Sequence, residues 1–297
     1  MTPDPTPVLD VGGTHVTAAL VDLDSLRVVD RRTHPLDADG DAETIIGTLT
    51  RAAGELQTGP GRVWGVAMPG PFDYAGGRGS FDGVGKFAEI AGVDLKERLG
   101  RELGTTRDDV RFLNDADAYA LGEWDAHDRP ERLCCVTLGT GVGGGFVQAG
   151  RILTDDPRVP AGGDLYHQRW DGAPLEEHVS RRALLREFGV PGLDVRDIAE
   201  RAIAGDVAAT DLFSHAMQVL AHVLAPWISS FRPQVVVVGG SIAQSWSLVG
   251  PPLQRGLQDA VADAPPVRPS QLQQDAPLVG AAEFVRTPTA SQGRTHR

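Results

Sequence analysis

The feature that most constrains this chain is a strand, a glycine turn and a second strand, an arrangement that occurs twice. The first copy joins apolar residues 8–9 to 16–21 through the turn Asp10-Val11-Gly12-Gly13-Thr14. The second joins the apolar run 133–138 to residues 146–148 through the glycine-rich segment 139–145. Apolar runs that flank a glycine turn are typical of β-hairpins. Two halves that open in the same way predict a duplicated α/β fold with a cleft between two domains, where small ligands commonly bind.

Apolar spacing predicts the elements around these hairpins. Helices are predicted over 42–56, 116–124 and most of 175–230. Buried strands are predicted over 62–68, 110–113 and 235–238. Segments 76–85 and 155–174 are predicted as loops, and the polar tail 287–297 is expected to fray.

Charge and composition exclude several classes of protein. The 297 residues carry a net charge of −12, which disfavours nucleic acid and anionic membranes as partners. The two cysteines, Cys134 and Cys135, are adjacent and have no other partner, as expected in a reducing compartment. The N-terminus lacks the basic and apolar regions of a signal peptide, and no apolar run approaches the ~18 residues of a membrane span. We therefore expect a cytoplasmic protein.

The first glycine turn has the residues of a phosphate site. Glycine lets the backbone approach an anion, and successive N–H groups bind it. Gly12 and Gly13 supply such backbone, and Thr14 adds a hydroxyl donor. Asp10 would repel a bare phosphate, so it is expected to hold Mg²⁺ or a water bound to that ion. The alternative is a plain hairpin turn with an incidental acid.

The second glycine turn has five glycines in the seven positions 139–145, more than a tight turn requires. It contains the GxGxxG spacing, but a strand rather than a helix is predicted to follow, which counts against a dinucleotide site. A phosphate-binding loop is favoured over a simple β-turn.

A third candidate is Asn114-Asp115-Ala116-Asp117, where a predicted strand meets a predicted helix. A carboxylate at this position is well placed to act as a general base. Helix capping is the alternative, because Asn and Asp are favoured N-cap residues.

Together these elements resemble the ROK family of sugar kinases, within the superfamily of hexokinases and actin-like ATPases. The resemblance covers six segments in the family's order, at residues 10–14, 65–73, 114–123, 137–145, 237–241 and 277–282. It implies a two-domain, ribonuclease H-like α/β fold of the actin-like ATPase type with an interdomain cleft. The small domain would span 1–114 and the large domain 115–277, with a C-terminal helix near 278–297 that can pack back on the small domain.

The resemblance also implies an activity, the transfer of phosphate from Mg·ATP to a hexose or amino-hexose hydroxyl, at the 6-position. Asp115 would be the general base. Glucose is the family's usual substrate, and an amino sugar such as kanosamine or an N-acetylhexosamine is the alternative. The sugar contacts would come from Gly70, Asn114, Asp115, Asp164, His167 and Glu176. The contacts to ATP and its phosphates would come from Asp10, Gly12, Gly13, Thr14, Thr140, Gly141, Gly239 and Gly240.

The chain departs from the family pattern around the predicted sugar site. The family's E-x-G-H motif becomes Asp164-Leu165-Tyr166-His167, and no N-L-x-x-W element occurs between residues 76 and 86. The cysteine-rich zinc motif CxCGxxGCxE is replaced by residues 168–176, which contain no cysteine. Since a structural zinc needs four good ligands, no zinc is expected. Glu176 matches the last residue of that motif, and Glu177 does so if the alignment shifts by one.

Two other functions were weighed. Sugar-responsive repressors of the family carry an N-terminal helix-turn-helix domain, for which a phosphate motif beginning at Asp10 leaves no room. A sugar sensor without catalysis is the remaining alternative, and retention of Asp115 and both glycine turns argues against it. A homo-oligomer, a dimer, is expected from the resemblance.

Overall fold

The computed structural model describes residues 4–81 and 86–286, and the chain divides into two compact units. Unit 1 comprises Met1–Ala118 and Pro277–Arg297, and unit 2 comprises Tyr119–Ala276. Helix α3 (Asp115–Ala126) contains the boundary, so one continuous helix carries the chain from unit 1 into unit 2. The predicted tail 287–297 and residues 82–85 of the predicted loop lie outside the described residues.

Among its described residues, unit 1 has one main sheet, a small hairpin and three α-helices besides α3. Its strands are β1 (Thr6–Val11), β2 (His15–Asp22), β3 (Arg27–Pro35), β4 (Trp64–Met68), β5 (Phe72–Asp73), β6 (Arg78–Gly79) and β7 (Val110–Asn114). Its further helices are α1 (Ala42–Gly54), α2 (Leu95–Glu102) and α9 (Ala276–Arg286).

Unit 2 has a second sheet and a larger set of helices. Its strands are β8 (Arg132–Leu138), β9 (Val142–Gln148), β10 (Arg151–Ile152), β11 (Arg169–Trp170), β12 (Ala173–Pro174), β13 (Val235–Gly239) and β14 (Val267–Pro269). Its helices are α4 (Glu176–Val179), α5 (Arg181–Phe188), α6 (Val195–Ile203), α7 (Val207–Phe231) and α8 (Trp246–Ala260). No helix in the described ranges is long and apolar enough to cross a membrane.

The two main sheets have the same topology. Their strand orders are β3-β2-β1-β4-β7 and β10-β9-β8-β13-β14. In each sheet the first three strands of the order pair antiparallel, and the last two join by parallel pairing. The duplicated α/β architecture predicted from the two glycine turns is therefore confirmed, and each turn joins the central strand of its sheet to the next.

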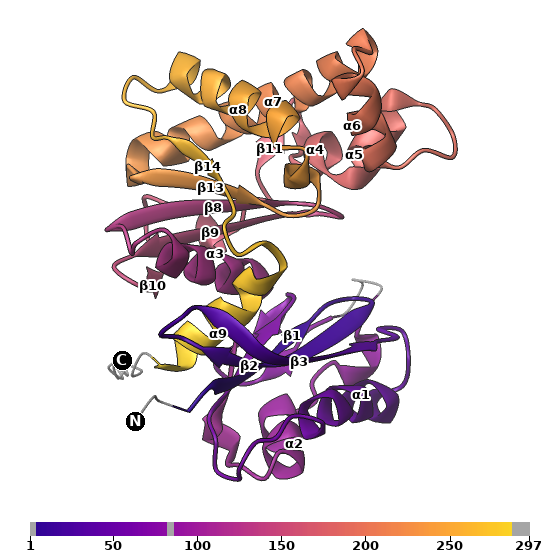
Figure 1. Cartoon of the computed structure of the whole chain (residues 1–297), viewed down its shortest axis with the longest axis vertical. Coiled ribbons are helices and arrows are strands. Elements are labelled where there is room, and N and C mark those ends of the chain that lie inside the picture. Colours follow the sequence, from indigo (N-terminus) through magenta and orange to yellow (C-terminus); the bar gives the residue numbers. More distant parts are fainter. Residues whose placement is uncertain (1–3, 82–85, 287–297) are drawn as a thin grey trace. The chain divides into compact units, whose positions relative to one another are not determined.

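Each sheet has helices on both faces (Figure 1). In unit 1, α1 and α2 cover one face, and α9 covers the other, where Gly65 of β4 lies so close to Ala281 that a Cβ would be 2.3 Å from its carbonyl oxygen. In unit 2, α7 and α8 cover one face of the sheet and α3 lies on the other (Figure 1). Fully buried aromatic and aliphatic residues such as Trp64 in unit 1 and Phe213 in unit 2 fill the two cores.

The second glycine turn is shorter than predicted. Chain reversal takes only residues 139–141, and β9 already begins at Val142. Gly143, Gly144 and Gly145 are therefore strand residues rather than turn residues. The reason is packing, because a Cβ on Gly144 would lie 2.4 Å from the side chain of the fully buried Leu165. Strands β3, β5, β6, β10, β11, β12 and β14 were not predicted, and β6, β11 and β12 lie in segments that were predicted as loops.

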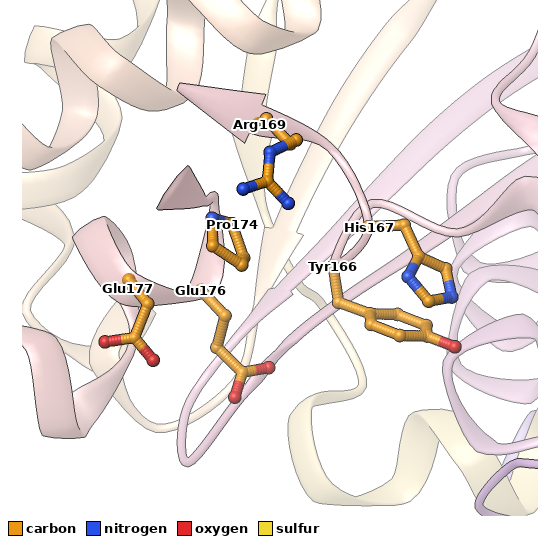
Figure 2. A pocket seen from close by; sticks show the side chains of 6 residues that line it. All are labelled: Tyr166, His167, Arg169, Pro174, Glu176 and Glu177. Carbon is orange, nitrogen blue, oxygen red and sulfur yellow. The ribbon is translucent and has the colours of Figure 1, made fainter. Parts of the chain in front are cut away.

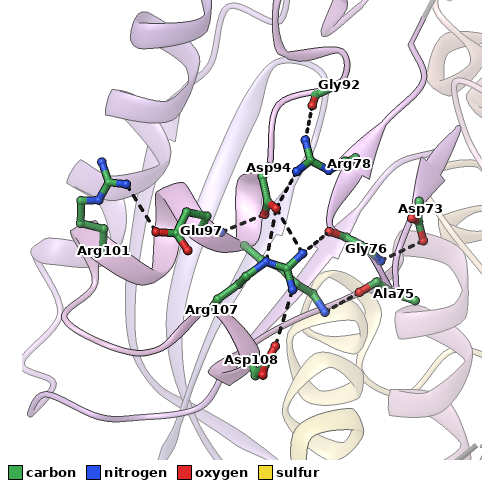
Figure 3. Close-up of polar contacts among 11 residues, drawn as sticks. Asp73, Ala75, Gly76, Arg78, Gly92, Asp94, Glu97, Arg101, Arg107 and Asp108 are labelled. Carbon is green, nitrogen blue, oxygen red and sulfur yellow. Dashed lines mark hydrogen bonds and ion pairs between the residues drawn. The ribbon is translucent and has the colours of Figure 1, made fainter.

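A cluster of charged residues in unit 1 fixes the segment that follows Gly70 (Figure 3). Asp94 is the N-cap of α2 and accepts the Glu97 N–H at 3.0 Å. Its second oxygen, Oδ2, accepts from Arg78 Nη2 at 2.8 Å and from Arg107 Nη2 at 3.2 Å. Burial alone would raise the pKa of Asp94, but these donors and charges together lower it.

The same cluster holds the backbone of the β5–β6 turn. Arg107 Nη2 donates to the Gly76 carbonyl at 2.9 Å, and Lys96 Nζ donates to the Ala75 carbonyl at 2.7 Å (Figure 3). The Arg107 and Lys96 side chains therefore donate hydrogen bonds to two turn carbonyls that have no partner in a strand.

We predict that Asp94→Ala lowers the free energy of unfolding by about 1–3 kcal/mol, because a helix cap and two ion pairs are lost. Asp94→Asn retains the cap and should cost less than about 1 kcal/mol. Urea denaturation at pH 7 measures both values. Asp108→Ala is the control, because that side chain is 91% exposed where it pairs with Arg107. Since the folded-state pKa of Asp94 is lowered, the advantage of the wild type over Asp94→Asn should be lost as the pH falls through that pKa.

Candidate functional site

The carboxyl ends of β1, β4 and β7 meet at one edge of the unit 1 sheet. Parallel pairing aligns Asp10 with Ala67 and Met68 with Asn114. Asp10 is the next-to-last residue of β1, and Asn114 is the last residue of β7. Asp115 follows as the first residue of α3. Residues predicted from two separate motifs therefore lie at one edge, where α/β proteins commonly bind ligands.

Two carboxylates with raised pKa values lie at this edge. The pKa of Asp10 is raised to about 7, mainly by burial and then by the negative charge of Asp115, while Arg31 opposes the shift. Burial also raises the pKa of Asp115, although the N–H groups of Ala116 and of Asp115 itself oppose the change. Asp115 as a whole residue is solvent-exposed, which tempers this desolvation. A raised pKa makes Asp115 a better proton acceptor than an ordinary carboxylate.

Asn114 positions the start of α3. Its Oδ1 accepts the N–H groups of Ala116 at 2.9 Å and Asp117 at 3.3 Å, so the capping role weighed from sequence is present. Its Nδ2 donates to the Tyr74 hydroxyl at 3.0 Å. The same hydroxyl lies 3.3 Å from the position of a Cβ on Gly70. Tyr74, which the sequence did not single out, therefore lies beside two predicted sugar contacts.

The first glycine turn leaves β1 and returns along β2. The Gly12 N–H donates to the His15 carbonyl at 2.8 Å, which closes the turn. The Thr14 hydroxyl lies 3.0 Å from His15 Nδ1. Lys86 Nζ lies 2.8 Å from the position of a Cβ on Gly13. An exposed cation next to this turn is a favourable arrangement for an anionic ligand, and no sequence pattern predicted it.

The second glycine turn lies beside a predicted sugar residue. The Gly139 N–H donates to the Gly141 carbonyl at 3.0 Å, and Thr140 is exposed at the tip. A Cβ on Gly141 would be 2.9 Å from Glu176 Oε2. Unit 2 therefore brings a predicted phosphate-binding glycine and a predicted sugar-binding acid into direct proximity.

A cavity of about 240 Å³ contains two of the three sugar residues predicted in unit 2 (Figure 2). Its lining residues are Tyr166, His167, Arg169, Pro174, Glu176 and Glu177. Asp164 is not among them, but its charge acts on one of the lining residues. The pKa of Tyr166 is raised mainly by burial, next by the charge of Asp164, and least by the charge of Glu176. The rings of Tyr166 and His167 are 3.9 Å apart. The sequence did not single out Arg169 or Pro174.

The two adjacent acids on the first turn of α4 have different environments. Glu177 pairs with Arg182 and Arg186 of α5, and Arg186 is the main cause of its lowered pKa. Glu176 lies against Gly141 instead. Figure 2 shows the two carboxylates pointing in different directions. Glu176 is therefore the better placed of the two alternatives for a ligand contact.

Packing and hydrogen bonds hold the short β11–β12 hairpin, where the absence of the family's zinc-motif cysteines predicts no zinc. The Trp170 ring contacts the His222 ring of α7 edge-on at 4.5 Å, and the Trp170 carbonyl lies 3.1 Å from His178 Nε2. Trp227 Nε1 donates to Gln168 Oε1 at 3.1 Å. Within residues 4–81 and 86–286, no group of three or more His, Cys, Asp or Glu side chains could hold a metal ion.

A second cavity, of about 370 Å³, lies where β13 ends. Gly239 and Gly240 line it, as do Tyr119, Ser270, Trp246 and Gln273 among others. Gly240 has a φ of +87°, and a Cβ there would be 2.2 Å from the Leu138 carbonyl. Only glycine allows β13 to turn this closely past the end of β8. Of the lining residues, Val238, Gly239, Gly240 and Ser241 belong to the segment 237–241 of the family resemblance.

Comparisons with known proteins identify relatives over most of the chain. The ROK family model matches residues 7–159 and 171–287. Glucokinase from Thermotoga maritima is 26% identical, over 94% of this chain and 96% of that protein. N-acetyl-D-glucosamine kinase from Haemophilus influenzae is 27% identical, over 79% of this chain and 83% of that protein.

A solved structure agrees with these relatives. The ROK hexokinase from Thermus thermophilus superposes with a TM-score of 0.73 at 30% identity, covering 94% of this chain and 96% of that one. The predicted actin-like α/β fold is thereby confirmed. The family match is interrupted between residues 159 and 171, a stretch that contains Asp164, Tyr166 and His167. The departure noted from the sequence therefore coincides with the interruption.

We predict that Asp10→Asn stabilises the fold at pH 8, by about 1–3 kcal/mol of unfolding free energy. The folded-state pKa of about 7 lies above the ordinary value of 3.8, so the stability of the wild type falls as the pH rises between these values. The variant has no carboxylate charge to bury at this position, so it has the higher unfolding free energy at pH 8. This difference should vanish near pH 4, where Asp10 of the wild type is protonated in the folded state. Urea denaturation across this range measures it.

Asp22→Asn is the matched control for that experiment. The Ser25 hydroxyl and the Asp24 N–H lower the pKa of Asp22, so removing its charge should give no gain at pH 8. An equal stability difference for Asp10→Asn at every pH would contradict the assigned shift.

Proposed function

The chain belongs to the ROK family, and we propose that it is an ATP-dependent sugar kinase that phosphorylates a hexose or amino-hexose hydroxyl. Relatives named as glucokinase and N-acetyl-D-glucosamine kinase support this class of reaction. The 6-hydroxyl is the proposed acceptor.

The observation that carries the proposal is the pair of carboxylates at the carboxyl edge of the unit 1 sheet. Asp115 begins α3 beside Asn114, its pKa is raised, and it is accessible to water. These are the properties of a general base for a hydroxyl. Asp10 lies close enough for its pKa to respond to the Asp115 charge.

In the proposed reaction, Asp115 accepts the proton of the sugar hydroxyl while the oxygen of that hydroxyl attacks the γ-phosphorus of ATP. The bond from the γ-phosphorus to the β,γ-bridging oxygen breaks, and ADP leaves. Asn114 keeps Asp115 in place by capping α3. Phosphoryl transfer depends mainly on positioning and charge stabilisation, which the backbone at Gly12, Gly13, Thr140 and Gly141 would supply with the Thr14 hydroxyl. The exposed Lys86 cation beside Gly13 would add to it.

Asp10 fits a role toward Mg²⁺. Its carboxyl is partly buried and close to a second acid, a situation that a divalent cation relieves. When bound with ATP, Mg²⁺ would neutralise charge on the phosphates. Oxygens of water and ATP would complete its ligands.

The sugar contacts are proposed separately for each unit. Unit 1 would contribute Gly70, Asn114 and Asp115, and unit 2 would contribute Asp164, His167 and Glu176. In unit 2 the proximity of His167 and Glu176 to one cavity supports their assignment. The replacement of the family's Glu by the shorter Asp164, beside Tyr166, supports a choice of sugar other than plain glucose. An amino sugar such as kanosamine or an N-acetylhexosamine is the alternative to glucose.

The cavity beside Gly239 and Gly240 would take the nucleoside of ATP.

A panel of hexoses and amino-hexoses incubated with Mg·ATP and scored for ADP release tests the function directly. Sugar-dependent ADP release supports a kinase and identifies the substrate. Sugar binding by calorimetry without ADP release for any sugar would instead favour the second candidate, a sugar sensor without catalysis. The same panel with polyphosphate would show whether another phosphoryl donor is accepted.

We predict that Asp115→Asn lowers kcat by about 10²–10⁴-fold and leaves sugar binding intact, because only the proton acceptor is lost. Steady-state kinetics and sugar titration measure the two effects. Asp117→Asn is the matched control, since it makes the same change two residues later on α3. Turnover of Asp115→Asn close to that of the control would remove Asp115 from this role.

We predict that His167→Ala raises the KM for sugar by about threefold to a hundredfold, the value of one neutral or charge-assisted hydrogen bond, and leaves the KM for ATP nearly unchanged. His215→Ala, an exposed histidine of α7, is the control. If His167→Ala instead lost affinity for ATP and kept its affinity for sugar, the assignment of this cavity to the sugar would be wrong. Asp164→Glu, which introduces the family's usual acid, should shift the preference among sugars.

A further inference from the structure

Glu123, in the middle of α3, is a fully buried carboxylate that the proposed reaction does not use. Its Oε1 accepts the Ser270 hydroxyl at 2.7 Å and the Leu272 N–H at 2.9 Å. Its Oε2 accepts the Gln271 N–H at 2.9 Å and lies 3.3 Å from His127 Nδ1. Burying a carboxylate is costly unless its oxygens are satisfied, and here donors on both oxygens offset that cost.

Burial alone would raise the pKa of Glu123, but these donors lower it, so the group is a carboxylate at neutral pH. A carboxylate has two acceptor oxygens. It can therefore order three consecutive residues, 270–272, which form no strand or helix of their own. A side chain of α3 therefore helps to set the conformation of the segment between β14 and α9, together with the bond from the Ser270 N–H to the Val238 carbonyl at 3.0 Å.

Ser270 extends the network to the second cavity. Its hydroxyl oxygen accepts from the Tyr119 hydroxyl at 2.8 Å and from the Gln273 N–H at 2.7 Å. Tyr119, Ser270 and Gln273 all line that cavity. Glu123 does not, so it touches the cavity only through these residues.

Tyr119 in turn defines the wall beside the glycines. A Cβ on Gly239 would lie 2.2 Å from the Tyr119 hydroxyl, so the ring and the backbone of β13 are in closest contact here. Burial, as the largest cause, raises the pKa of Tyr119 to about 12, and the hydroxyl therefore stays protonated and donates to Ser270.

We propose that Glu123 is a positioning residue for the nucleotide pocket, which fixes Ser270 and through it Tyr119 so that the wall facing Gly239 and Gly240 is formed before the nucleotide binds. The inference rests on the proposed function only in taking a nucleotide as the ligand of this cavity. Ordering these groups in advance lowers the entropic cost of binding.

The test is the affinity for Mg·ADP, measured by calorimetry without sugar, in the wild type and in Glu123→Gln. An amide has one acceptor oxygen and one donor nitrogen, so it cannot accept hydrogen bonds on both sides. We expect the Kd for Mg·ADP to rise by about threefold to tenfold, the value of about one lost hydrogen bond, with the Kd for sugar unchanged.

Asp125→Asn is the matched control. Asp125 is also a buried acid of α3, its Oδ1 is 2.5 Å from Arg129 Nε, and it does not line the cavity. This variant should lower the Tm and leave the Kd for Mg·ADP within about twofold, well below the effect of one lost hydrogen bond. If both variants weaken Mg·ADP in proportion to lost stability, Glu123 acts only on folding and the proposal is overturned.

Tyr119→Phe keeps the proposal testable should Glu123→Gln fail to fold, because it removes one hydroxyl at the far end of the network. It should also weaken Mg·ADP. Combined with Glu123→Gln, it should give less than the product of the two single effects, since both act through Ser270. Independent, multiplicative effects would overturn the proposal, as would a wild type that does not bind Mg·ADP. A wild type that binds Mg·ADP but phosphorylates no sugar would overturn the proposed function alone.

Discussion

Parallel pairing next to an antiparallel hairpin is the constraint on which each unit depends. In unit 1 it aligns the ends of β1, β4 and β7, so that Asp10 and Asp115 reach the same edge although about a hundred residues separate them in the sequence. In unit 2 the same order brings the end of β13 against the end of β8, where Gly240 passes the Leu138 carbonyl. Glycine-containing turns follow these strand ends, because there the chain must pass close to another backbone segment or to a ligand.

The two acids proposed to act on ligands at the unit 1 edge are in an electrostatically unfavourable environment. Burial raises the pKa values of Asp10 and Asp115, and the negative charge of Asp115 raises that of Asp10 further, which lowers stability at neutral pH. Away from this edge, acids of the same unit have the opposite environment. Asp94 caps a helix and pairs with two arginines, so its charge is stabilising. The contrast separates acids that hold the fold together from acids that can act on a ligand.

Short polar networks position the ligand-facing groups of unit 2. The β11–β12 hairpin is held by Trp170 and Gln168, which contact two residues of α7. Each residue of the segment 270–272 donates a hydrogen bond to one carboxylate, that of Glu123. In both cases a residue that faces a cavity is fixed by one that does not. Such groups carry little signal in a sequence, because a buried Glu or a partly buried Trp reads as an ordinary helix or core residue.

The sequence alone determined the repeated hairpin, the glycine turns and the position of Asp115 between a strand and a helix, because each depends on a few neighbouring residues. It also determined the family, whose motifs are local. The tertiary structure decided what depends on distant residues. It ends the second turn at Gly141 because Leu165 packs on Gly144 inside β9. It separates Glu176 from Glu177 through the arginines of α5, and it joins Glu123 to Ser270, which lies 147 residues later in the chain. Such contacts form only when the chain folds, so no local pattern encodes them.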